Sequence, residues 1–455
     1  MKAAFHTLGC KVNQYETEAI KEAFVSRAAE ITDADDIADI YVINTCSVTG
    51  IADRKSRQFI RRAKRLNPEA VVVVTGCYAQ TAPEELEDMP EVDLIIGNSL
   101  KTEIAEKAIE LYEKKSCIVQ GEKETELPRT HVLSYEELRD FEDMGIVTSG
   151  ESRMCRAYIK IEEGCNRFCS YCLIPYARGR VRSRQPDEIL KEACALVGSG
   201  YKELVLTGIN TALYGTEQGF SFERRPGEEG LSGLEAVLSR LDAMDGDFRI
   251  RLSSLEPTVV NKDDVLKLLG FKRLCHHLHL SVQSGSDKVL KAMNRRYTRN
   301  EYLEIVDAIR EFDPLYGITT DIIVGFPGET EADFEDSLDV TKKSGFGKVH
   351  VFRYSPRRGT PGESMPDAVP GDVKNERAAK LAELADEVTL GFIRRHEGRR
   401  ERVLIEEIND GYAEGYTGSY IKVYIECGED RAVVPGEFRD VTIGLPFRDG
   451  CIAAL

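Results

Sequence analysis

Long apolar runs and a surplus of positive charge are both missing from this sequence of 455 residues. No apolar run approaches the roughly 20 residues that a membrane-spanning helix needs, and residues 1–7 lead into a strand pattern rather than a signal peptide. We therefore expect a cytoplasmic protein, monomeric and without a membrane anchor. The formal net charge of −17 argues against broad, nonspecific nucleic-acid binding. The length suggests about three domains.

A nearby fourth metal ligand is also missing, next to a group of three cysteines. Cys165, Cys169 and Cys172 are spaced C-x3-C-x2-C, and no Cys or His follows within the next twenty residues. Thiolates suit zinc or iron–sulfur clusters. A structural zinc or an ordinary four-iron cluster takes four protein ligands, so three local ligands would leave one metal position open for chemistry.

The spacing of these cysteines, with Tyr171 directly before the last one, resembles that of the radical S-adenosylmethionine (SAM) superfamily. The resemblance implies that the cysteines hold three irons of a 4Fe–4S cluster, whose fourth iron binds the amino and carboxylate groups of SAM, and that Tyr171 lies beside this cofactor. The spacing also allows a zinc knuckle whose fourth ligand comes from far away, such as His276 or His277.

The first 115 or so residues alternate apolar strands with amphipathic helices, which predicts a parallel α/β sheet of the Rossmann or flavodoxin type. Three predicted strands are each followed by a cysteine, namely Cys10, Cys46 and Cys77. Because the carboxyl ends of parallel strands share one edge, where ligands bind, we expect a second site with three thiolates there. Alternatively, three small thiols simply pack under the loops. The predicted strands are Lys2–Thr7, Asp39–Asn44, Val71–Thr75 and Val92–Ile96; the helices are Tyr15–Ala29 and Arg54–Leu66; residues 118–152 form a connector.

From residue 156 to about 354, six strand–helix units predict an incomplete TIM-like (βα)6 barrel, with its active site at the carboxyl ends of the strands. The predicted strands are Ala157–Glu162, Glu203–Leu206, Arg249–Leu252, His277–Ser281, Ile318–Val324 and Val349–Arg353. Small or polar residues follow these strands and could bind a nucleoside and a methionine, although each one alone could simply form the turn after its strand. They are Thr207, Gly208, Asn210, Glu256, Ser281, Gln283 and Gly325.

The last 70 or so residues predict a helix and then a small antiparallel β-barrel, because short alternating runs are separated by Gly-rich and charged turns. The runs are Val403–Glu407, Gly411–Gly418, Ile421–Glu426 and Val441–Leu445. We place the domain boundaries at 1–140, 141–384 and 385–455.

Two runs of basic residues depart from the acidic average. Arg54–Arg65 has seven basic residues in twelve, and Arg394–Arg402 has five arginines in nine. Each run could be a solvated helix face or connector, or it could contact a polyanion. The residues that we predict to contact RNA are Arg54, Arg61, Arg62, Arg65, Arg394, Arg395, Arg399 and Arg400.

Nearly the whole chain resembles the methylthiotransferase family of radical SAM enzymes. The matching motifs are TLGCKVNQYE at Thr7, VINTCSVT at Val42, TGCYAQ at Thr75, EEGCNRFCSYCLIPYARG at Glu162, LSVQSGSD at Leu280, MNRRYT at Met293, GFPGET at Gly325 and FRYSPRRGTP at Phe352. The stretch from Gly415 to Val423 resembles a TRAM domain, an RNA-binding module. There Tyr416 and Tyr420 are expected to be exposed and to stack on bases; the alternative is that both fill the barrel interior.

The resemblance implies two 4Fe–4S clusters, an auxiliary one on Cys10, Cys46 and Cys77 and a SAM cluster on the other three cysteines, with no acid–base residue carrying the reaction. Within this family, the sequence most resembles the branch that transfers a methylthio group to C2 of N6-threonylcarbamoyladenosine. That branch acts at position 37, in the anticodon loop of tRNA, and uses two SAM molecules. An electron donor such as flavodoxin or ferredoxin and a sulfur source would be partners. Arg357 is our candidate for binding the threonyl carboxylate of the substrate.

Two alternatives remain at this point. The same chemistry could act on isopentenyl-adenosine in tRNA or on a ribosomal-protein side chain. The chain could also be a zinc-stabilised RNA-binding protein without catalytic activity.

Overall fold

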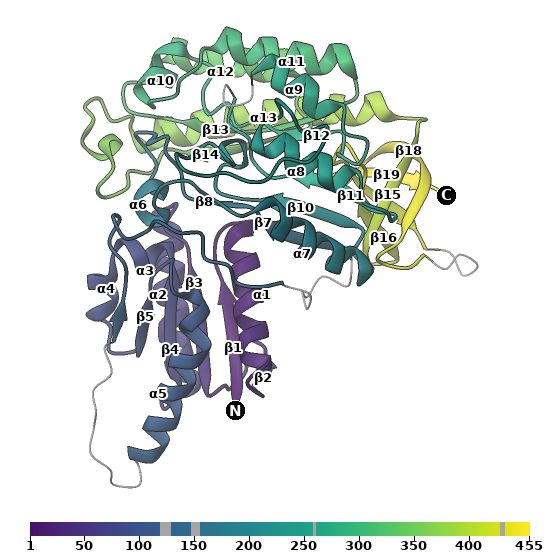
Figure 1. Cartoon of the computed structure of the whole chain (residues 1–455). Coiled ribbons are helices and arrows are strands. Elements are labelled where there is room, and N and C mark those ends of the chain that lie inside the picture. Colours follow the sequence, from purple (N-terminus) through teal and green to yellow (C-terminus); the bar gives the residue numbers. More distant parts are fainter. Residues whose placement is uncertain (119–128, 147–154, 258–260, 428–432) are drawn as a thin grey trace.

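The computed structural model describes residues 1–118, 129–146, 155–257, 261–427 and 433–455 (Figure 1). It confirms the predicted α/β class, with an N-terminal parallel sheet, a partial parallel barrel and a closed C-terminal barrel. No helix in these ranges combines the length and the apolar character needed to cross a bilayer.

The N-terminal part is a six-stranded parallel sheet with the flavodoxin-like order β2-β1-β3-β4-β5-β6. Every residue of β3 and β4 is buried because helices cover both faces of the sheet. Ile60 of α2 packs on one face, whereas Phe24 of α1 and Ile104 of α5 pack on the other. The elements are β1 (Lys2–Thr7), α1 (Lys11–Val25), β2 (Glu30–Thr32), β3 (Ile40–Thr45), α2 (Gly50–Leu66), β4 (Val71–Gly76), α3 (Cys77–Thr81), α4 (Pro83–Glu87), β5 (Leu94–Ile96), η1 (Lys101–Glu103), α5 (Ile104–Ile118) and β6 (Thr130–His131).

Three details of this part differ from the sequence prediction. Helix α1 begins at Lys11, four residues earlier than predicted, because Cys10 is already extended at its N-cap. Helix α2 begins at Gly50, where the Thr49 side chain accepts the backbone N–H of Ala52 and caps the first turn. The segment predicted as a connector supplies β6, which pairs in parallel with β5; residues 119–128 and 147–152 of it lie outside the described ranges.

The middle part is the predicted half-open barrel of six parallel strands. β11-β10-β7 and β12-β13-β14 form two sheets, and bridges between residues 250 and 274 and between 255 and 280 join them into one arc. Its elements are β7 (Arg156–Lys160), β8 (Glu162–Glu163), α6 (Ile174–Arg178), β9 (Arg182–Ser183), α7 (Pro186–Gly198), β10 (Glu203–Thr207), η2 (Thr211–Leu213), α8 (Gly233–Asp242), β11 (Arg249–Leu252), α9 (Lys262–Leu269), β12 (His277–His279), α10 (Asp287–Ala292), α11 (Arg299–Phe312), β13 (Gly317–Val324), α12 (Glu331–Ser344), β14 (Lys348–Arg353), η3 (Pro361–Ser364) and α13 (Gly371–His396).

The N-terminal sheet docks with its carboxyl edge against this arc (Figure 1). Helix α1 contacts β7, and α3 contacts α6, the short helix that follows the cysteine loop. Asn98, after β5, donates to the Ala177 carbonyl of α6 at 2.8 Å. The loops that carry the two groups of cysteines therefore meet at one boundary.

The C-terminal part is a closed barrel of five strands, β15-β16-β17-β19-β18. The prediction missed β19 and expected only antiparallel pairs, whereas β17 and β19 pair in parallel. Helix α13 is continuous across the predicted boundary at 384/385. The strands are β15 (Arg400–Asn409), β16 (Tyr412–Tyr416), β17 (Lys422–Glu426), β18 (Phe438–Phe447) and β19 (Gly450–Ala454).

A buried cluster of charges joins this small barrel to the amino-terminal ends of the large one. Glu203 on β10 is fully buried and pairs with Arg156 at 2.7 Å, Arg249 at 2.6 Å and Arg251 at 3.0 Å. Arg249 and Arg251 also donate to backbone carbonyls in the loop between β16 and β17. One carboxylate therefore organises three guanidinium groups at the domain junction.

We expect Glu203→Gln to lower the free energy of unfolding by about 3–5 kcal/mol, because it leaves buried Arg251 and the largely buried Arg156 and Arg249 without their shared carboxylate. Asp35→Asn is the matched control: Asp35 pairs with Arg62 at 2.8 Å, but its side chain is 64% exposed, so we expect less than about 1 kcal/mol. Denaturant unfolding of both variants measures the difference. Equal losses would contradict the assigned role of Glu203.

Candidate active site

The three N-terminal cysteines lie together at the carboxyl edge of the sheet. Cys10 is the N-cap of α1, Cys46 directly follows β3, and Cys77 is the first residue of α3 after β4. Gly9, at φ +115°, makes this close approach possible: a Cβ there would lie 2.9 Å from Cβ and 3.1 Å from Sγ of Cys46. Burial, with the nearby Cys77 thiol, raises the pKa of Cys46 to about 12, so a bound metal would have to displace its proton.

The second group of cysteines lies in the loop between β8 and α6. Gly164, at φ +83°, turns the chain into this loop, and a Cβ there would lie only 1.9 Å from the Arg180 carbonyl oxygen. The backbone N–H of Cys165 donates to the Gly179 carbonyl at 3.0 Å, and that of Cys172 donates to the Cys169 carbonyl at 2.9 Å. These bonds fold three thiols into one compact turn.

Both groups of cysteines open onto one cavity of about 220 Å³. Cys77 lines it from the N-terminal sheet, and Cys172 lines it from the barrel loop. Its other lining residues include Ser47, Thr49, Tyr171, Gln283, Asp321 and Phe352. The structure therefore brings the two cysteine motifs, far apart in sequence, to a single chamber.

Several residues predicted to contact a cofactor converge beside Cys169. Asn210 donates to Glu256 at 2.8 Å, and Glu256 also pairs with Arg167 at 3.0 Å and Arg295 at 3.2 Å. The Arg295 guanidinium lies 3.5 Å from Sγ of Cys169 and donates to the Ser281 carbonyl at 3.0 Å.

The other predicted cofactor residues are spread more widely. Tyr171 and Gln283 line the shared cavity. Thr207 ends β10 and Gly208 follows it, where a Cβ would lie 2.5 Å from a Glu162 carboxylate oxygen. Gly325 lies instead against Lys374 of α13. Sequence reasoning missed Arg167 and Arg295, although Arg295 lies in the quoted MNRRYT motif.

The polar groups around this loop fit a bound ligand and do not fit a single metal ion. Buried Asn210 Oδ1, Ser253 Oγ and Glu162 Oε1 have no hydrogen-bond partner among the described residues, which is unusual unless a ligand supplies one. No three His, Cys, Asp or Glu side chains within the described ranges are placed to hold one metal ion. In a zinc site all the ligands bind one ion, whereas an iron–sulfur cluster takes each thiolate on a different iron.

Comparison with known proteins agrees with this geometry. The model of the Radical SAM superfamily matches residues 159–341, and that of the "Uncharacterized protein family UPF0004" matches residues 2–97. The chain is 39% identical to the threonylcarbamoyladenosine tRNA methylthiotransferase MtaB of Bacillus subtilis (strain 168), covering 98% of this chain and 95% of that protein. The chain belongs to the tRNA methylthiotransferase family of radical SAM enzymes.

Other relatives in this family have two different names. The protein named MtaB from Thermotoga maritima is 40% identical, over 98% of this chain and 95% of that protein. The tRNA-2-methylthio-N(6)-dimethylallyladenosine synthase of Carboxydothermus hydrogenoformans is 36% identical, over 88% of this chain and 87% of that protein. Among solved structures, the radical SAM methyltransferase TsrM from Kitasatospora setae has a TM-score of 0.53 at 13% identity, covering 91% of this chain and 80% of that one, a likeness that concerns the fold alone.

In this methylthiotransferase, the predicted RNA-contacting arginines of α2 begin close to the cavity. Ser47 and Thr49 line the cavity, and α2 leads away from it. Arg54, Arg61 and Arg65 are exposed, whereas Arg62 is half-buried and pairs with Asp35.

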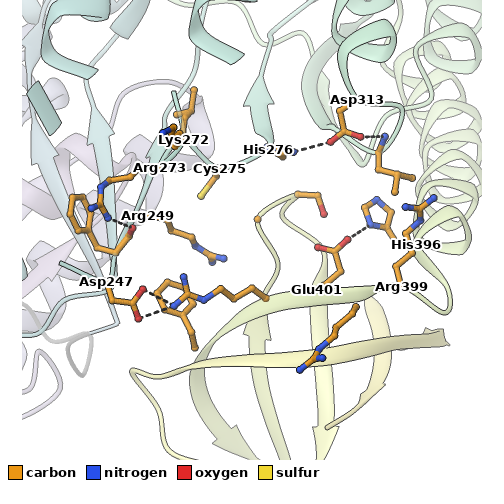
Figure 2. Close-up of a pocket in the computed structure, with 18 residues that line it drawn as sticks. Asp247, Arg249, Lys272, Arg273, Cys275, His276, Asp313, His396, Arg399 and Glu401 are labelled. Carbon is orange, nitrogen blue, oxygen red and sulfur yellow. Dashed lines mark hydrogen bonds and ion pairs between the residues drawn. The ribbon is translucent and has the colours of Figure 1, made fainter. Parts of the chain in front are cut away.

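The arginines at and just after the end of α13 lie far from the cavity along the chain, and two of them, Arg399 and Arg400, line a second cavity. Arg394, Arg395, Arg399 and Arg400 are exposed. Figure 2 shows the second cavity, of about 650 Å³, between the large barrel and the C-terminal barrel, with Lys272 and Arg399 at its wall. Neither of these two side chains has an ion pair within the described part of the chain, whereas neighbouring Arg402 pairs with Asp247 at 2.6 Å.

The prediction that Tyr416 and Tyr420 are exposed is wrong. Their rings stack on each other with centroids 5.0 Å apart, and the Arg156 guanidinium lies over both. Tyr420 also packs against His277 and Arg251 of the large barrel. Both rings are half-buried at the domain junction, so they fill neither the small barrel nor a free surface.

Arg357, the candidate for reading a carboxylate, already has two partners at the cavity rim. Its guanidinium donates to Ser47 Oγ at 3.0 Å and to Asp53 at 2.6 Å. It therefore ties the segment after β14 to the start of α2.

Two neighbouring glutamates of β8 have opposite pKa shifts. Burial raises the pKa of Glu162 well above its ordinary value, because backbone donors such as Asn210 N–H, at 2.9 Å, only partly oppose it. Burial also acts on Glu163, but Lys160 and Arg178 outweigh it and hold that pKa well below the ordinary value. Burial thus favours the protonated form of Glu162, whereas Lys160 and Arg178 favour the ionised form of Glu163.

We expect Glu163→Gln to cost about 3–5 kcal/mol of unfolding free energy near neutral pH. This cost should shrink as the pH falls, because a depressed pKa contributes stability above the unfolded pKa and loses it in acid. Glu162→Gln mimics the protonated side chain, and wild type should lose stability relative to it as the pH rises, since a raised pKa contributes at low pH. Unfolding midpoints from about pH 5 down to about pH 2 measure the Glu163 trend, and midpoints from about pH 5 up to about pH 8 measure the Glu162 trend; the same trend in both variants would contradict the assignment.

Proposed function

We propose that this enzyme transfers a methylthio group to C2 of N6-threonylcarbamoyladenosine at position 37 of tRNA. The observation that carries the proposal is the single cavity shared by Cys77 and Cys172, which belong to the two cysteine groups. The choice of substrate is supported by relatives of that name at 39% and 40% identity, against 36% for the dimethylallyladenosine enzyme.

The residues present suit two 4Fe–4S clusters, one on each group of cysteines, with three protein ligands and one open iron apiece. When bound, the clusters and SAM supply the radical and the sulfur that acid–base side chains cannot deliver to an unactivated C–H bond. The Arg295–Glu256–Asn210 group would orient SAM, because it lies against Cys169 and includes a buried oxygen that has no partner among the described residues.

The shape of the cavity favours one extruded base as the substrate. Its volume of about 220 Å³ is below the roughly 300–1,000 Å³ of pockets for drug-sized ligands. Val48 and Phe352 are large apolar residues at this site, 54% and 46% exposed. They offer surfaces on which a base from the anticodon loop can stack once it leaves its neighbours.

Nucleoside analysis tests the substrate. We expect tRNA from a strain without this gene to lack 2-methylthio-N6-threonylcarbamoyladenosine, and we expect wild type, but not Cys77→Ala, to restore it. Loss of the dimethylallyl nucleoside instead would favour the alternative substrate, and an unchanged profile would contradict both.

Iron analysis tests the cofactors. We expect about eight irons per chain, and we expect this number to fall to about four when either cysteine group is replaced by alanine. Zinc without iron would indicate a binding protein.

We further expect the exposed face of α2 to contact tRNA phosphates. The double variant Arg61→Glu, Arg65→Glu should weaken tRNA binding while SAM cleavage persists. The slope of the logarithm of the binding constant against the logarithm of the salt concentration should become shallower by about 1 for each phosphate that is no longer neutralised. The matched control is Lys107→Glu with Lys114→Glu on α5, which covers the opposite face of the sheet. Binding measured over a salt series decides; equal reductions in affinity for both pairs would contradict a specific role for α2.

A further inference from the structure

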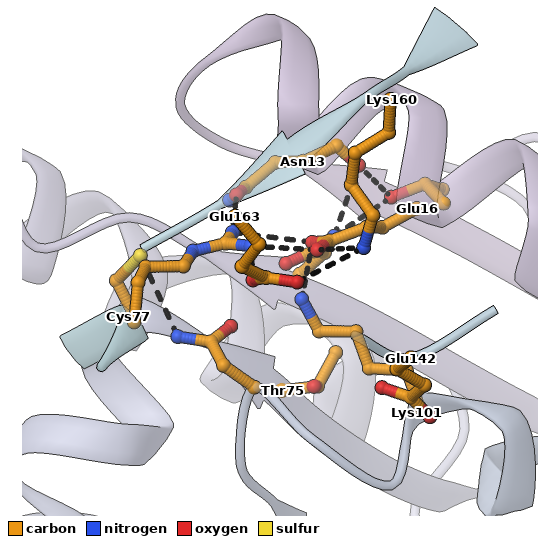
Figure 3. Close-up of polar contacts among 12 residues, drawn as sticks. Asn13, Glu16, Thr75, Cys77, Lys101, Glu142, Lys160 and Glu163 are labelled. Atoms are coloured by element: carbon orange, nitrogen blue, oxygen red, sulfur yellow. Dashed lines mark hydrogen bonds and ion pairs between the residues drawn. The ribbon is translucent and has the colours of Figure 1, made fainter. Parts of the chain in front are cut away.

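Five charged side chains are buried together where the N-terminal sheet meets the barrel (Figure 3). Arg178 pairs with Glu16 at 2.6 Å and with Glu163 at 2.6 Å. Lys160 pairs with Glu163 at 3.1 Å and Glu16 at 3.4 Å, and Lys101 pairs with Glu16. Each of these side chains is at most 1% exposed. We call this group the interface network.

The interface network exists only when the two domains are docked. Glu16 of α1 and Lys101 of η1 come from the N-terminal sheet. Lys160, Glu163 and Arg178 come from β7, β8 and α6 of the barrel. The network therefore fixes the cysteine edge of the sheet over the barrel loop.

The network contains more positive than negative charge. Burial tends to raise the pKa of Glu16, but Arg178, Lys101 and Lys160 outweigh it and hold that pKa at about 2. Glu16 and Glu163 pair with three basic groups, namely Arg178, Lys160 and Lys101, and Arg182 lies 3.9 Å from Glu163 as a fourth. The half-buried Glu142, which acts on Lys160 from further away, is the third carboxylate, so basic groups outnumber acidic ones by four to three. Burying an uncompensated charge is costly, so a further negative group is needed nearby.

The N-terminal cysteines are where that negative charge would be. Arg178 donates to Asn13 Oδ1, the same oxygen that lies 3.7 Å from Cys10 Sγ. Asn98 Nδ2 lies 3.8 Å from Cys77 Sγ and donates to Ala177, the residue before Arg178. The buried Nε of Arg178 has no partner among the described residues.

We propose that Arg178, held by Glu16 and Glu163, is a positioning residue that balances the negative charge of the cluster on Cys10, Cys46 and Cys77 and raises its reduction potential. The inference rests on the proposed function, which places a cluster there. Reduction adds one electron to a thiolate-ligated cluster that is already anionic, so a buried cation close to it favours the reduced form. The surplus charge of the interface network supplies that cation.

A redox titration of the full chain with both clusters bound, followed by electron paramagnetic resonance, tests the proposal. The signal of the N-terminal cluster is the one that disappears when Cys10, Cys46 and Cys77 are replaced by alanine. We expect Arg178→Gln to lower the ratio of reduced to oxidised cluster at least tenfold at a fixed potential, which corresponds to about 59 mV for one electron. Glu16→Gln removes a negative charge and should shift the potential the opposite way, whereas Arg178→Lys should stay close to wild type.

The SAM cluster is the internal control, because Arg295 rather than Arg178 lies against Cys169; its potential should stay unchanged in Arg178→Gln. Lys101→Met replaces Arg178→Gln if that variant does not fold, and it should shift the potential in the same direction. Opposite shifts for the Arg178 and Glu16 variants support the proposal, since a purely structural role would not reverse sign. Unshifted potentials with both clusters present would overturn this inference alone; a wild-type protein without the N-terminal cluster would overturn the proposed function as well.

Discussion

The buried contact between Arg178 and the two carboxylates of Glu16 and Glu163 is the constraint on which the active site depends. A guanidinium forms rigid, bidentate-type contacts, and here it joins a helix of the N-terminal sheet to a strand of the barrel. Because all three side chains are removed from water, small displacements of one domain would separate buried charges at high cost. The position of one cysteine loop is thereby tied to the position of the other.

This constraint explains how an α/β sheet and a half-open barrel can share a chamber. Each fold presents its cysteines at the carboxyl ends of parallel strands, which is where both kinds of parallel sheet bind ligands. The lining of the shared cavity combines Cys77 and Ser47 of the N-terminal part with Cys172 and Asp321 of the barrel. Docking creates the chamber, and the charges at the boundary determine the docking.

Outside the chamber, the exposed arginines are gathered in two places although the chain as a whole is acidic. The chain carries a net charge of −17, yet the exposed arginines of α2 start beside the chamber, and Arg399 and Arg400, which follow α13, line a second cavity (Figure 2). Ion pairs in which both side chains are exposed, such as Arg402 with Asp247, are worth little individually. Local arrangement, rather than net charge, therefore decides where a polyanion can approach.

Local sequence was enough to predict the main strands and helices, the three-part architecture and the loops on which the six central cysteines lie, because strand periodicity and residue spacing are properties of short segments. It failed where a distant segment decides the environment. Tyr416 and Tyr420 have the pattern of exposed stacking residues, but arginines from β7 and β11 cover them. β19 was missed because its short apolar run forms a strand only by pairing with β17 and β18.

The sequence by itself determined which cysteines are the candidate cluster ligands and on which loops they lie, since these follow from residue type and spacing along the chain. Only the tertiary structure decided that the two loops face one chamber and that Arg178 lies between them with a surplus of buried charge. The physical reason is that burial and electrostatic balance depend on all neighbours in space, and most neighbours of Arg178 lie far from it in sequence.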